Sequence, residues 1–450
     1  MSHTDAYQQT LKFLYEDLPV FSKLGKTALK HDLHNIKKLC EALGNPEQKI
    51  RTIHIAGTNG KGSTSHALAA ILQHAGYKTG LYTSPHLIDF RERIRVNGVP
   101  ISQQWVVNFV QQHKTLIDTI APSFFEVTVA MALVAFATQQ VDFAVIETGL
   151  GGRLDSTNII TPELSIITNI SFDHQDVLGN TLKEIAGEKA GIIKSGVPVL
   201  IGEQNPDTDR VFLEKAIHAH STLYEATSFW DLVTTTSAHA RPQYRVVHKA
   251  RREIYDLHTD LTGSYQQHNI KTVLAAVEIL MIHSGLSITI PQALEALTSV
   301  KKTTGLRGRW DEVLHHPLIM ADVAHNPAGI QETMHQWGHI NANKKYILTG
   351  FVKDKDVQAV TSYFPKEELI YTCQAQIPRA MPVAELSEIF KEKGYQVYTG
   401  SSVEETLEKI ITQLEPDDAL LITGSFFVVG EALAYVDEKL KPQAYMRYTG

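Results

Sequence analysis

The spacing of apolar residues predicts helices at the start of the chain and, after them, strands that alternate with helices. Residues 4–18 and 27–44 have the spacing of amphipathic helices. The run 51–57 is short, apolar and ends in glycine, which is typical of a buried strand, and 65–76 has helical spacing up to a glycine stop. A repeated order of strand and helix indicates a parallel sheet covered by helices.

The alternation continues through the first half of the chain. Further helices are expected at 102–117 and 124–139. Further strands are expected at 78–83, 141–149, 163–170 and 197–202. The run 141–149 is apolar almost throughout, as is typical of a parallel strand buried on both faces.

Residues 221–262 differ, because polar and apolar residues alternate there and predict antiparallel hairpins. Helices return at 266–284 and 291–299. The stretch KKTTGLRGR, residues 301–309, is rich in Gly, Lys and Arg, and we interpret it as a linker between domains. Beyond it the alternation restarts, with strands expected at 317–323, 344–351, 367–373 and 418–425.

Composition excludes several classes of protein. The net charge is −7 and no Lys/Arg-rich block occurs, so the chain has no electrostatic footprint for nucleic acid. Cys40 and Cys373 are its two cysteines, which argues against disulfides or a Cys-based zinc site and favours the reducing cytoplasm. The N-terminus lacks the features of a secretory signal, and no apolar run is long enough to span a membrane.

The stretch HIAGTNGKGSTSHAL, residues 54–68, places a glycine-rich loop between an expected strand and an expected helix. This is the context of a phosphate-binding loop, in which amides at a helix N-terminus face an anion. We expect Lys61 to reach the β- and γ-phosphates, and Ser63 or Thr64 to contact phosphate or magnesium. The alternative is a tight glycine turn that only joins the strand to the helix.

These patterns together predict an α/β protein with two domains. Residues 1–300 are expected to form a large P-loop ATPase-like domain, with a mostly parallel sheet and a small antiparallel subdomain. Residues 310–450 are expected to form a smaller Rossmann-like α/β domain, which has the usual size of a domain.

Glu147 stands at the carboxyl end of an expected buried strand, where α/β sheets bind ligands. Magnesium between phosphates needs oxygen ligands, so Glu147 is a candidate to supply one. The alternative is a solvated residue at the end of a strand. The glycines of the GLGG stretch that follows favour the functional interpretation, because they permit close approach of the backbone.

RERIRVNG, residues 91–98, alternates arginines with Glu, Ile and Val and ends in Asn-Gly. This pattern predicts a hairpin strand with one solvated basic face. A basic face also suits an acidic substrate tail, but we favour the structural role.

The chain resembles the Mur-ligase superfamily, and most closely its folate branch, the dihydrofolate synthases and folylpolyglutamate synthases. The matching stretches keep one order and run through most of the chain. They are GTNGKGS (57–63), TSPHL (83–87), ETGLGGRLDSTN (147–158), FDHQDVLG (172–179), GEKAGIIK (187–194), GRW (308–310) and DVAHNP (322–327).

The resemblance implies ATP and two magnesium ions as cofactors. The implied ATP-binding residues are Gly57, Thr58, Asn59, Gly60, Lys61, Gly62, Ser63, Asn269, Arg309 and Asp322. The implied metal ligands are Ser84, Glu147, His174 and, as a carbamate, Lys189. Carbamylation would turn a cation into an anionic oxygen donor. Lys61, His174 and Lys189 are the expected catalytic residues, although taken alone His174 would be a structural histidine and Lys189 an exposed lysine. Asp173 and Asp176 are expected to support their loop, and the alternative is that either contacts the metal through a water molecule.

The resemblance also implies a folate site. Its expected residues are Ser22, Lys23, Leu24, Phe124, Phe125, Leu154, Asp155, Ser156 and His325. Flat pteridine rings stack well on aromatic side chains, which supports the two phenylalanines. The alternative for both is a place in the core of a helix.

The implied activity is that of an ATP-dependent amide ligase. ATP would phosphorylate a folate or pteroate carboxylate, and the amino group of L-glutamate would attack the acyl phosphate. Dihydropteroate and a folate that already bears glutamate both stay open as substrates. The alternatives are a ligase for a cell-wall precursor or amino-acid polymer, a nucleotide-dependent switch or motor, and a folate-binding protein without catalysis. We expect a cytoplasmic monomer that binds small molecules, and neither nucleic acid nor membrane.

Overall fold

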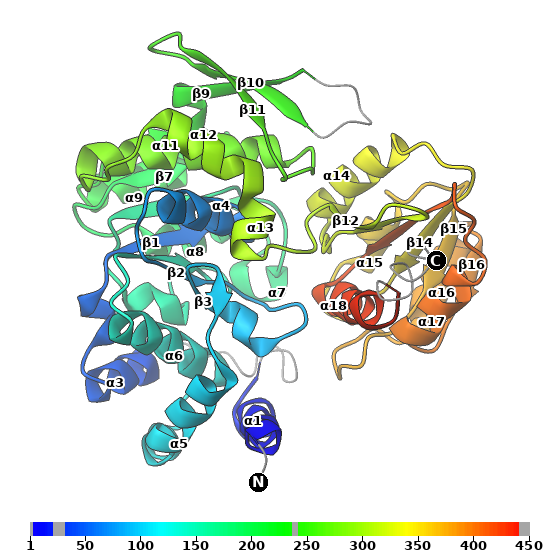
Figure 1. The fold of residues 1–450 in the computed structure, drawn as a ribbon, viewed down its shortest axis with the longest axis horizontal. Coiled ribbons are helices and arrows are strands. Elements are labelled where there is room, and N and C mark those ends of the chain that lie inside the picture. Colours follow the sequence, from blue (N-terminus) through cyan, green and yellow to red (C-terminus); the bar gives the residue numbers. More distant parts are fainter. Residues whose placement is uncertain (1–2, 21–31, 236–241, 441–450) are drawn as a thin grey trace, which may run out of the picture.

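The computed structural model describes residues 3–20, 32–235 and 242–440. Two α/β domains lie side by side, and the chain passes once between them (Figure 1). Each is built on one sheet, and a small antiparallel sheet lies on the first domain beyond the helices of one face. The two-domain α/β architecture predicted from the sequence is therefore confirmed.

The large sheet of the first domain has the strand order β4-β3-β2-β5-β1-β6-β7-β8. Six neighbouring strands of this order, β2, β5, β1, β6, β7 and β8, are parallel to one another. The other two, β3 and β4, form an antiparallel hairpin at the edge next to β2. Their bounds are β1 Thr52–Ala56, β2 Thr79–Tyr82, β3 Ile94–Val96, β4 Val99–Pro100, β5 Phe143–Glu147, β6 Leu164–Ile167, β7 Val199–Ile201 and β8 Leu223–Glu225. The central strands β1, β5 and β6 are buried throughout, as near-continuous apolar runs predict.

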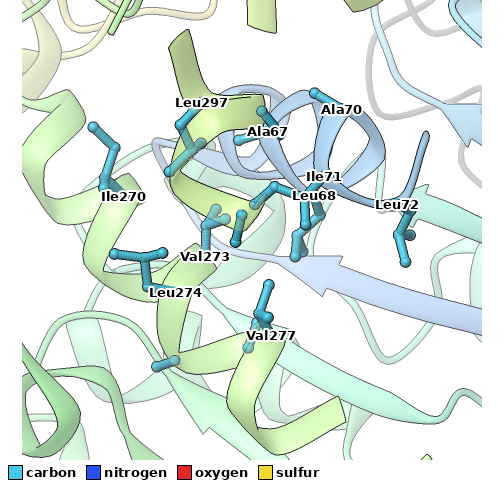
Figure 2. Close-up of a cluster of buried hydrophobic side chains, with 14 of the residues drawn as sticks. Ala67, Leu68, Ala70, Ile71, Leu72, Ile270, Val273, Leu274, Val277 and Leu297 are labelled. Carbon is cyan, nitrogen blue, oxygen red and sulfur yellow. The ribbon is translucent and has the colours of Figure 1, made fainter. Parts of the chain in front are cut away.

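Helices cover both faces of this sheet. On one face lie α4 (Lys61–His74), α11 (Gln266–His283) and α12 (Ile290–Ala296). Figure 2 shows how Leu68 and Ile71 of α4 pack toward Val273 and Val277 of α11. Burial of such aliphatic side chains, at about 1.5–3 kcal/mol each, is what fixes α4 and the loop before it.

The opposite face carries α3 (His34–Ala42), α5 (Gln103–Ile120) and α6 (Phe124–Thr138). α6 is apolar on all sides and is buried, as expected of a helix between other elements. α1 (His3–Lys12) continues as a π-helix over Phe13–Asp17 and packs near α5. The remaining helices of this domain are α7 (Gln175–Leu178), α8 (Leu182–Lys189), α9 (Asp209–His218) and α10 (Ala226–Phe229).

The small antiparallel sheet consists of β9 (Trp230–Thr234), β10 (Gln243–His248) and β11 (Ile254–His258). The hairpins expected within 221–262 are therefore present. The prediction is wrong for the start of that range, because β8 is not part of a hairpin but pairs in parallel with β7 at the edge of the large sheet. The preceding α9 forms a crossover, and a helical crossover returns the chain parallel to the strand before it.

The second domain has a six-stranded sheet in the order β12-β13-β17-β14-β15-β16, parallel except for β12. Its strands are β12 Asp311–Leu314, β13 Leu318–Ala321, β14 Lys345–Thr349, β15 Leu369–Thr372, β16 Val397–Thr399 and β17 Ala419–Thr423. Its helices are α14 Pro327–Gly338, α15 Val357–Thr361, α16 Val383–Glu392, α17 Val403–Ile411 and α18 Phe426–Tyr435, which a π-helix continues over Val436–Leu440.

The connection between the domains is shorter than the expected linker 301–309. Helix α13 (Val300–Thr304) includes the first of these residues. It ends at Gly305, whose φ of 70° is the left-handed conformation that favours glycine. The non-helical connection to β12 therefore begins at Gly305.

The arginines of RERIRVNG do not form a solvated face, so that part of the prediction is wrong. A hairpin is present, with Val96 opposite Val99 across the Asn-Gly turn, but its first strand begins only at Ile94, because Phe90–Arg93 form a 3-10 helix. Arg93 and Arg95 are only 7% and 8% exposed, because other parts of the fold cover them, such as the Phe124 ring against Arg93. Gly305, for example, lies directly against the Arg95 guanidinium.

In the part of the chain that the structure describes, no helix combines the length and apolarity that crossing a membrane would require.

Candidate active site

The phosphate-binding loop joins β1 to α4 and is tightly constrained. Gly57 and Gly60 have φ values of 149° and 82°. A Cβ atom on Gly57 would collide with the Thr168 side chain, and one on Gly60 with Asn269. The amides of Thr58 and Asn59 donate to Asn169, at 3.0 and 2.9 Å. The loop is thereby fixed so that the N-terminus of α4, whose first amides have no acceptor within the helix, lines the cavity described below.

Lys61 is the first residue of α4. Its ammonium donates to the carbonyls of Gly57 and Thr58, both at 3.1 Å. Burial lowers the pKa of Lys61, while the Glu147 and Asp173 carboxylates act in the opposite direction. The ammonium thus rests on its own loop, next to the space that an anion at the helix N-terminus would take.

Glu147 ends β5, between the ends of β1 and β2, and is 4% exposed. The Ser84 amide donates to its carboxylate at 3.2 Å. Burial raises the pKa of Glu147, and Lys61 and Arg309 lower it. The alternative considered from the sequence, that Glu147 is a solvated residue at the end of a strand, is therefore wrong.

The surroundings of Glu147 suit magnesium. Among the described residues, no three His, Cys, Asp or Glu side chains form a ready-made metal cluster. Magnesium does not need one, because it keeps several waters and binds through one or two carboxylates together with substrate phosphates. A buried carboxylate beside the phosphate loop meets that requirement.

Lys189 is the last residue of α8 and is buried, not exposed. Its Nζ donates to the Gly57 carbonyl at 2.8 Å, so it lies directly behind the phosphate loop. Burial, followed by the charge of Lys61, lowers the pKa of Lys189 to about 7. A neutral amine at this position is therefore accessible near physiological pH.

His174 precedes α7 and has a left-handed backbone with φ of 50°. Burial lowers its pKa to about 3, so the ring is neutral. Its Nε2 lies 3.3 Å from the Lys355 ammonium. A neutral imidazole beside a cation accepts a hydrogen bond from that cation through its lone pair, which is also the lone pair that would bind a metal.

The connection between the domains contributes Arg309, and the second domain contributes Asp322. Asp322 follows β13 and accepts hydrogen bonds from the Tyr265 hydroxyl at 2.6 Å and the Trp310 amide at 2.7 Å. Arg309 lies over the Phe426 ring, with 5.1 Å to its centroid. A Cβ on Gly62 would be 3.3 Å from Arg309 and 3.8 Å from Glu147. Arg309, Glu147 and the first turn of α4 therefore meet at one point.

Asp173 joins the two domains. Its carboxylate accepts from His325 at 3.2 Å and Asn326 at 3.1 Å, and it pairs with Lys355. These three donors, with Asp173, are called the Asp173 latch below. Although burial acts to raise it, Lys355, His174 and His325 hold the pKa of Asp173 well below its usual value.

The sequence interpretation expected Asp173 to support its loop and did not include Lys355. Asp173 does accept from the His174 amide at 2.9 Å, in addition to its contacts across the domains. Lys355 lies 182 positions from Asp173, so sequence spacing contains no sign of the pair. The available signal was a lysine shortly after an expected strand end.

We expect Lys355→Ala to open the latch. The change leaves the buried Asp173 carboxylate without its cation, which costs a buried pair about 3 kcal/mol. Small-angle X-ray scattering should then report a larger radius of gyration for the ligand-free chain. Lys353→Ala, an exposed lysine of the same loop, is the matched control. An unchanged radius in Lys355→Ala would contradict the role of the latch.

One cavity of about 1550 Å³ runs between the domains, and residues of both line it. It brings together the predicted site residues that the structure describes. Those that line it are Gly57, Thr58, Asn59, Gly60, Lys61, Gly62, Ser63, Ser84, Phe124, Phe125, Glu147, Leu154, Asp155, Ser156, His174, Lys189, Asn269, Arg309, Asp322 and His325. Ser22, Lys23 and Leu24 lie outside the described residues.

The two candidate phenylalanines differ. Phe124 is 5% exposed and is stacked on Tyr15, with ring centroids 5.3 Å apart. Phe125 is half-buried and packs over Gly149 at the cavity wall. Phe125 is therefore the ring more open to a flat ligand, whereas Phe124 also belongs to the core.

Asp155 shapes the loop after β5. Its carboxylate accepts from the amides of Gly149, Leu150 and Thr157, at 2.9, 2.8 and 3.0 Å, and from the Thr157 hydroxyl at 2.5 Å. These bonds hold the GLGG loop against the cavity. A ligand at this position would meet a carboxylate that is already well supplied with donors.

Comparison with known proteins agrees with this geometry. Residues 55–278 match the Mur ligase middle domain, and residues 308–426 match the glutamate ligase domain of Mur ligases. The dihydrofolate synthase/folylpolyglutamate synthase of Bacillus subtilis is 34% identical over 95% of this chain and 98% of its own.

Solved structures of similar proteins hold nucleotides. Escherichia coli FolC in complex with DHPP and ADP superposes with a TM-score of 0.83 at 26% identity, over 97% of this chain and 99% of its own. The bifunctional folylpolyglutamate synthase/dihydrofolate synthase of Yersinia pestis, complexed with AMPPNP and Mn ion, gives a TM-score of 0.80 at 26% identity, over 97% and 99%. The chain belongs to the dihydrofolate synthase/folylpolyglutamate synthase family of Mur ligases.

Proposed function

We propose that this chain joins L-glutamate to the carboxylate of a pteroate or folate, with ATP converted to ADP and phosphate. The chain is an ATP-dependent amide ligase by its family. The name of the Bacillus relative covers both dihydrofolate and folylpolyglutamate synthesis. We infer the same two acceptors here, dihydropteroate and a reduced folate that already bears glutamate.

One observation carries this proposal. The first turn of α4, Glu147 and Arg309 converge, although Arg309 belongs to the connection with the second domain. A nucleotide whose phosphates sit on the loop would therefore contact both domains. Such a site opens and closes around its substrates, which suits a reaction with a water-sensitive intermediate.

The chemistry follows from the weakness of a carboxylate as an electrophile. Transfer of the γ-phosphoryl group to it forms a P–O bond and gives an acyl phosphate, with ADP as the leaving group. The glutamate amine then attacks the acyl carbon, the C–O bond breaks, and phosphate leaves. Phosphoryl transfer depends mainly on positioning and charge neutralisation, which Lys61, Arg309 and the α4 N-terminus would supply.

Magnesium, when bound, would neutralise the phosphate charges. We propose that two such ions are held by Glu147, Ser84, His174 and a carbamylated Lys189. Asn269 and Asp322 would bind the nucleotide. The pteroate or folate and L-glutamate would be bound by Phe125, Leu154, Ser156 and His325. We expect a cytoplasmic monomer.

Carbamylation of Lys189 makes a separate prediction. Only a neutral amine reacts with CO2, so carbamate formation should rise as the pH passes upward through about 7. Enzyme equilibrated with 13C-bicarbonate at pH 8 should give a carbamate carbon signal by NMR. Lys189→Ala should lack this signal, whereas Lys215→Ala, on the exposed side of α9, should keep it. Identical spectra for Lys189→Ala and the unmodified chain would contradict the assignment.

The function is tested with the purified chain, ATP, magnesium and L-glutamate. Dihydropteroate and tetrahydrofolate are added separately, and product masses are recorded. We expect one glutamyl residue added per ADP formed. ATP turnover triggered only by a UDP-linked peptide would favour a cell-wall ligase, and turnover without any amide product would favour a nucleotide switch.

A further inference from the structure

Arg93 is an unexplained cation in the wall of the cavity. It ends the 3-10 helix Phe90–Arg93, lines the cavity, and is 7% exposed. Its Nε donates to His86 Nδ1 at 2.9 Å, and its guanidinium lies 5.3 Å from the centroid of the Phe124 ring. It also lies against the Tyr82 hydroxyl. None of these three partners carries a negative charge.

The acidic residues next to Arg93 are committed elsewhere. Asp89 pairs with Arg91 at 2.7 Å, and Glu92 accepts from the amides of residues 87–89. In the part of the chain that the structure describes, no carboxylate lies within ion-pair distance of Arg93. The stretches outside that part contain no Asp or Glu in their sequence.

Other cations in the cavity wall form ion pairs with carboxylates of the chain. Arg153 pairs with Glu188 at 2.8 Å, and Arg379 pairs with Asp354 at 2.6 Å. Lys355 belongs to the Asp173 latch. A buried cation without a counter-ion is costly unless a ligand supplies one, and a guanidinium presents paired donors that match a carboxylate.

The structure holds Arg93 ready for such a ligand. Burial, together with the charge of Arg93, lowers the pKa of His86 to about 3, so the imidazole is neutral and accepts from Arg93. The other ring nitrogen of His86 contacts the Tyr15 hydroxyl at 3.3 Å. The side chain is therefore fixed by a neutral acceptor and an aromatic face, which leaves its charge uncompensated.

The backbone of Arg93 is hydrogen-bonded to the segment that carries Ser84, which contacts Glu147. Its carbonyl accepts from the Thr83 amide at 3.1 Å. The next residue, Ser84, donates to the Glu147 carboxylate. Arg93 and Glu147 line the same cavity, so one ligand can carry its reacting group toward Glu147 and a second, acidic group toward Arg93.

We propose that Arg93 binds the α-carboxylate of a folate that already bears glutamate, while the γ-carboxylate of the same glutamate is phosphorylated. This inference rests on the proposed function and deepens it. Dihydropteroate has no α-carboxylate, so Arg93 would be a specificity residue for the folylpolyglutamate reaction. The basic stretch RERIRVNG would then receive an acidic substrate group through one buried arginine.

The test compares two acceptors, tetrahydrofolate and its α-carboxamide, in which the γ-carboxylate stays free. The unmodified chain should prefer the acid in kcat/KM by about tenfold or more, as expected for a hydrogen-bonded charge. Arg93→Gln should lose this preference, mainly through a higher KM for the acid, and Arg93→Lys should keep part of it. Arg91→Gln, which changes the neighbouring arginine of the same motif, should retain the full preference.

The outcomes separate this inference from the proposed function. If the unmodified chain converts tetrahydrofolate and its amide equally well, or if Arg93→Gln keeps the preference, the assignment of Arg93 is overturned. If the unmodified chain converts neither dihydropteroate nor tetrahydrofolate, the proposed function itself fails. Thermal unfolding of each variant shows whether it is folded, and the acid-to-amide ratio does not depend on the amount of folded enzyme.

Discussion

Replacing Lys61 with alanine is expected to lower kcat about 1,000-fold or more, because the change removes a cation from the charge developed in phosphoryl transfer. The ammonium lies at the start of α4 on the carbonyls of Gly57 and Thr58, where the phosphates of a nucleotide would compete for it. The folate should still bind, since the proposed folate residues are on other elements. Steady-state ADP release and folate fluorescence titration measure the two effects.

Lys215→Ala is the matched control for this prediction, since it removes an exposed lysine from the helix α9. It should leave both turnover and folate binding near their original values. Near-normal turnover in Lys61→Ala would mean that the loop at residues 57–63 has been misinterpreted. Loss of folate binding together with turnover would instead indicate a collapsed site.

Replacing Glu147 with glutamine is expected to lower kcat/KM about 100-fold or more and to raise the magnesium concentration needed for half-maximal activity. Even residues that only support a metal ligand cost about 10–100-fold when changed, so a direct ligand should cost at least as much. Glutamine has nearly the same shape and keeps an acceptor for the Ser84 amide. The loss should therefore come from charge and not from packing.

The stability of this variant offers an internal check. Burial disfavours the charge of Glu147, so its neutral replacement should unfold at a similar or higher temperature in the absence of metal. Glu163→Gln, at a partly exposed carboxylate that pairs with Arg51, is the control and should retain normal magnesium dependence. A Glu147→Gln enzyme with unchanged magnesium dependence would show that the metal lies elsewhere.

The sequence pattern predicted the buried strands well, because a parallel strand covered on both faces has to be a short apolar run between turns. It did not predict β12 and β16. β12 is the short polar segment DEVL at a sheet edge, and β16 is the short segment VYT at the other edge. Edge strands of this kind depend on their neighbour for pairing and need no apolar run of their own.

The environment of charged residues was harder to predict than the strands. Alternation along RERIRVNG indicates which residues share a face, but not what covers that face, so Arg93 and Arg95 were expected in solvent. Asp173 and Lys355 meet only because the second domain folds against the first. Such contacts depend on how two domains pack, which the local pattern does not contain.

The positions of the candidate site were predictable where a strand end identified them. Glu147 is the last residue of β5 and Asp322 directly follows β13, and parallel sheets collect such carboxyl ends at one edge. Lys189 is different, because it lies at the end of a helix and is identified by the matching GEKAGIIK stretch rather than by any pattern of burial.

The central claim is that the acceptor carboxylate is phosphorylated before the amide forms. Dihydropteroate labelled with 18O in its carboxylate, incubated with ATP, magnesium and L-glutamate, tests it directly. Mass spectrometry of the inorganic phosphate should show one labelled oxygen for each amide formed, because the bridging oxygen of an acyl phosphate leaves with phosphorus. Amide formation that yields only unlabelled phosphate would contradict the account.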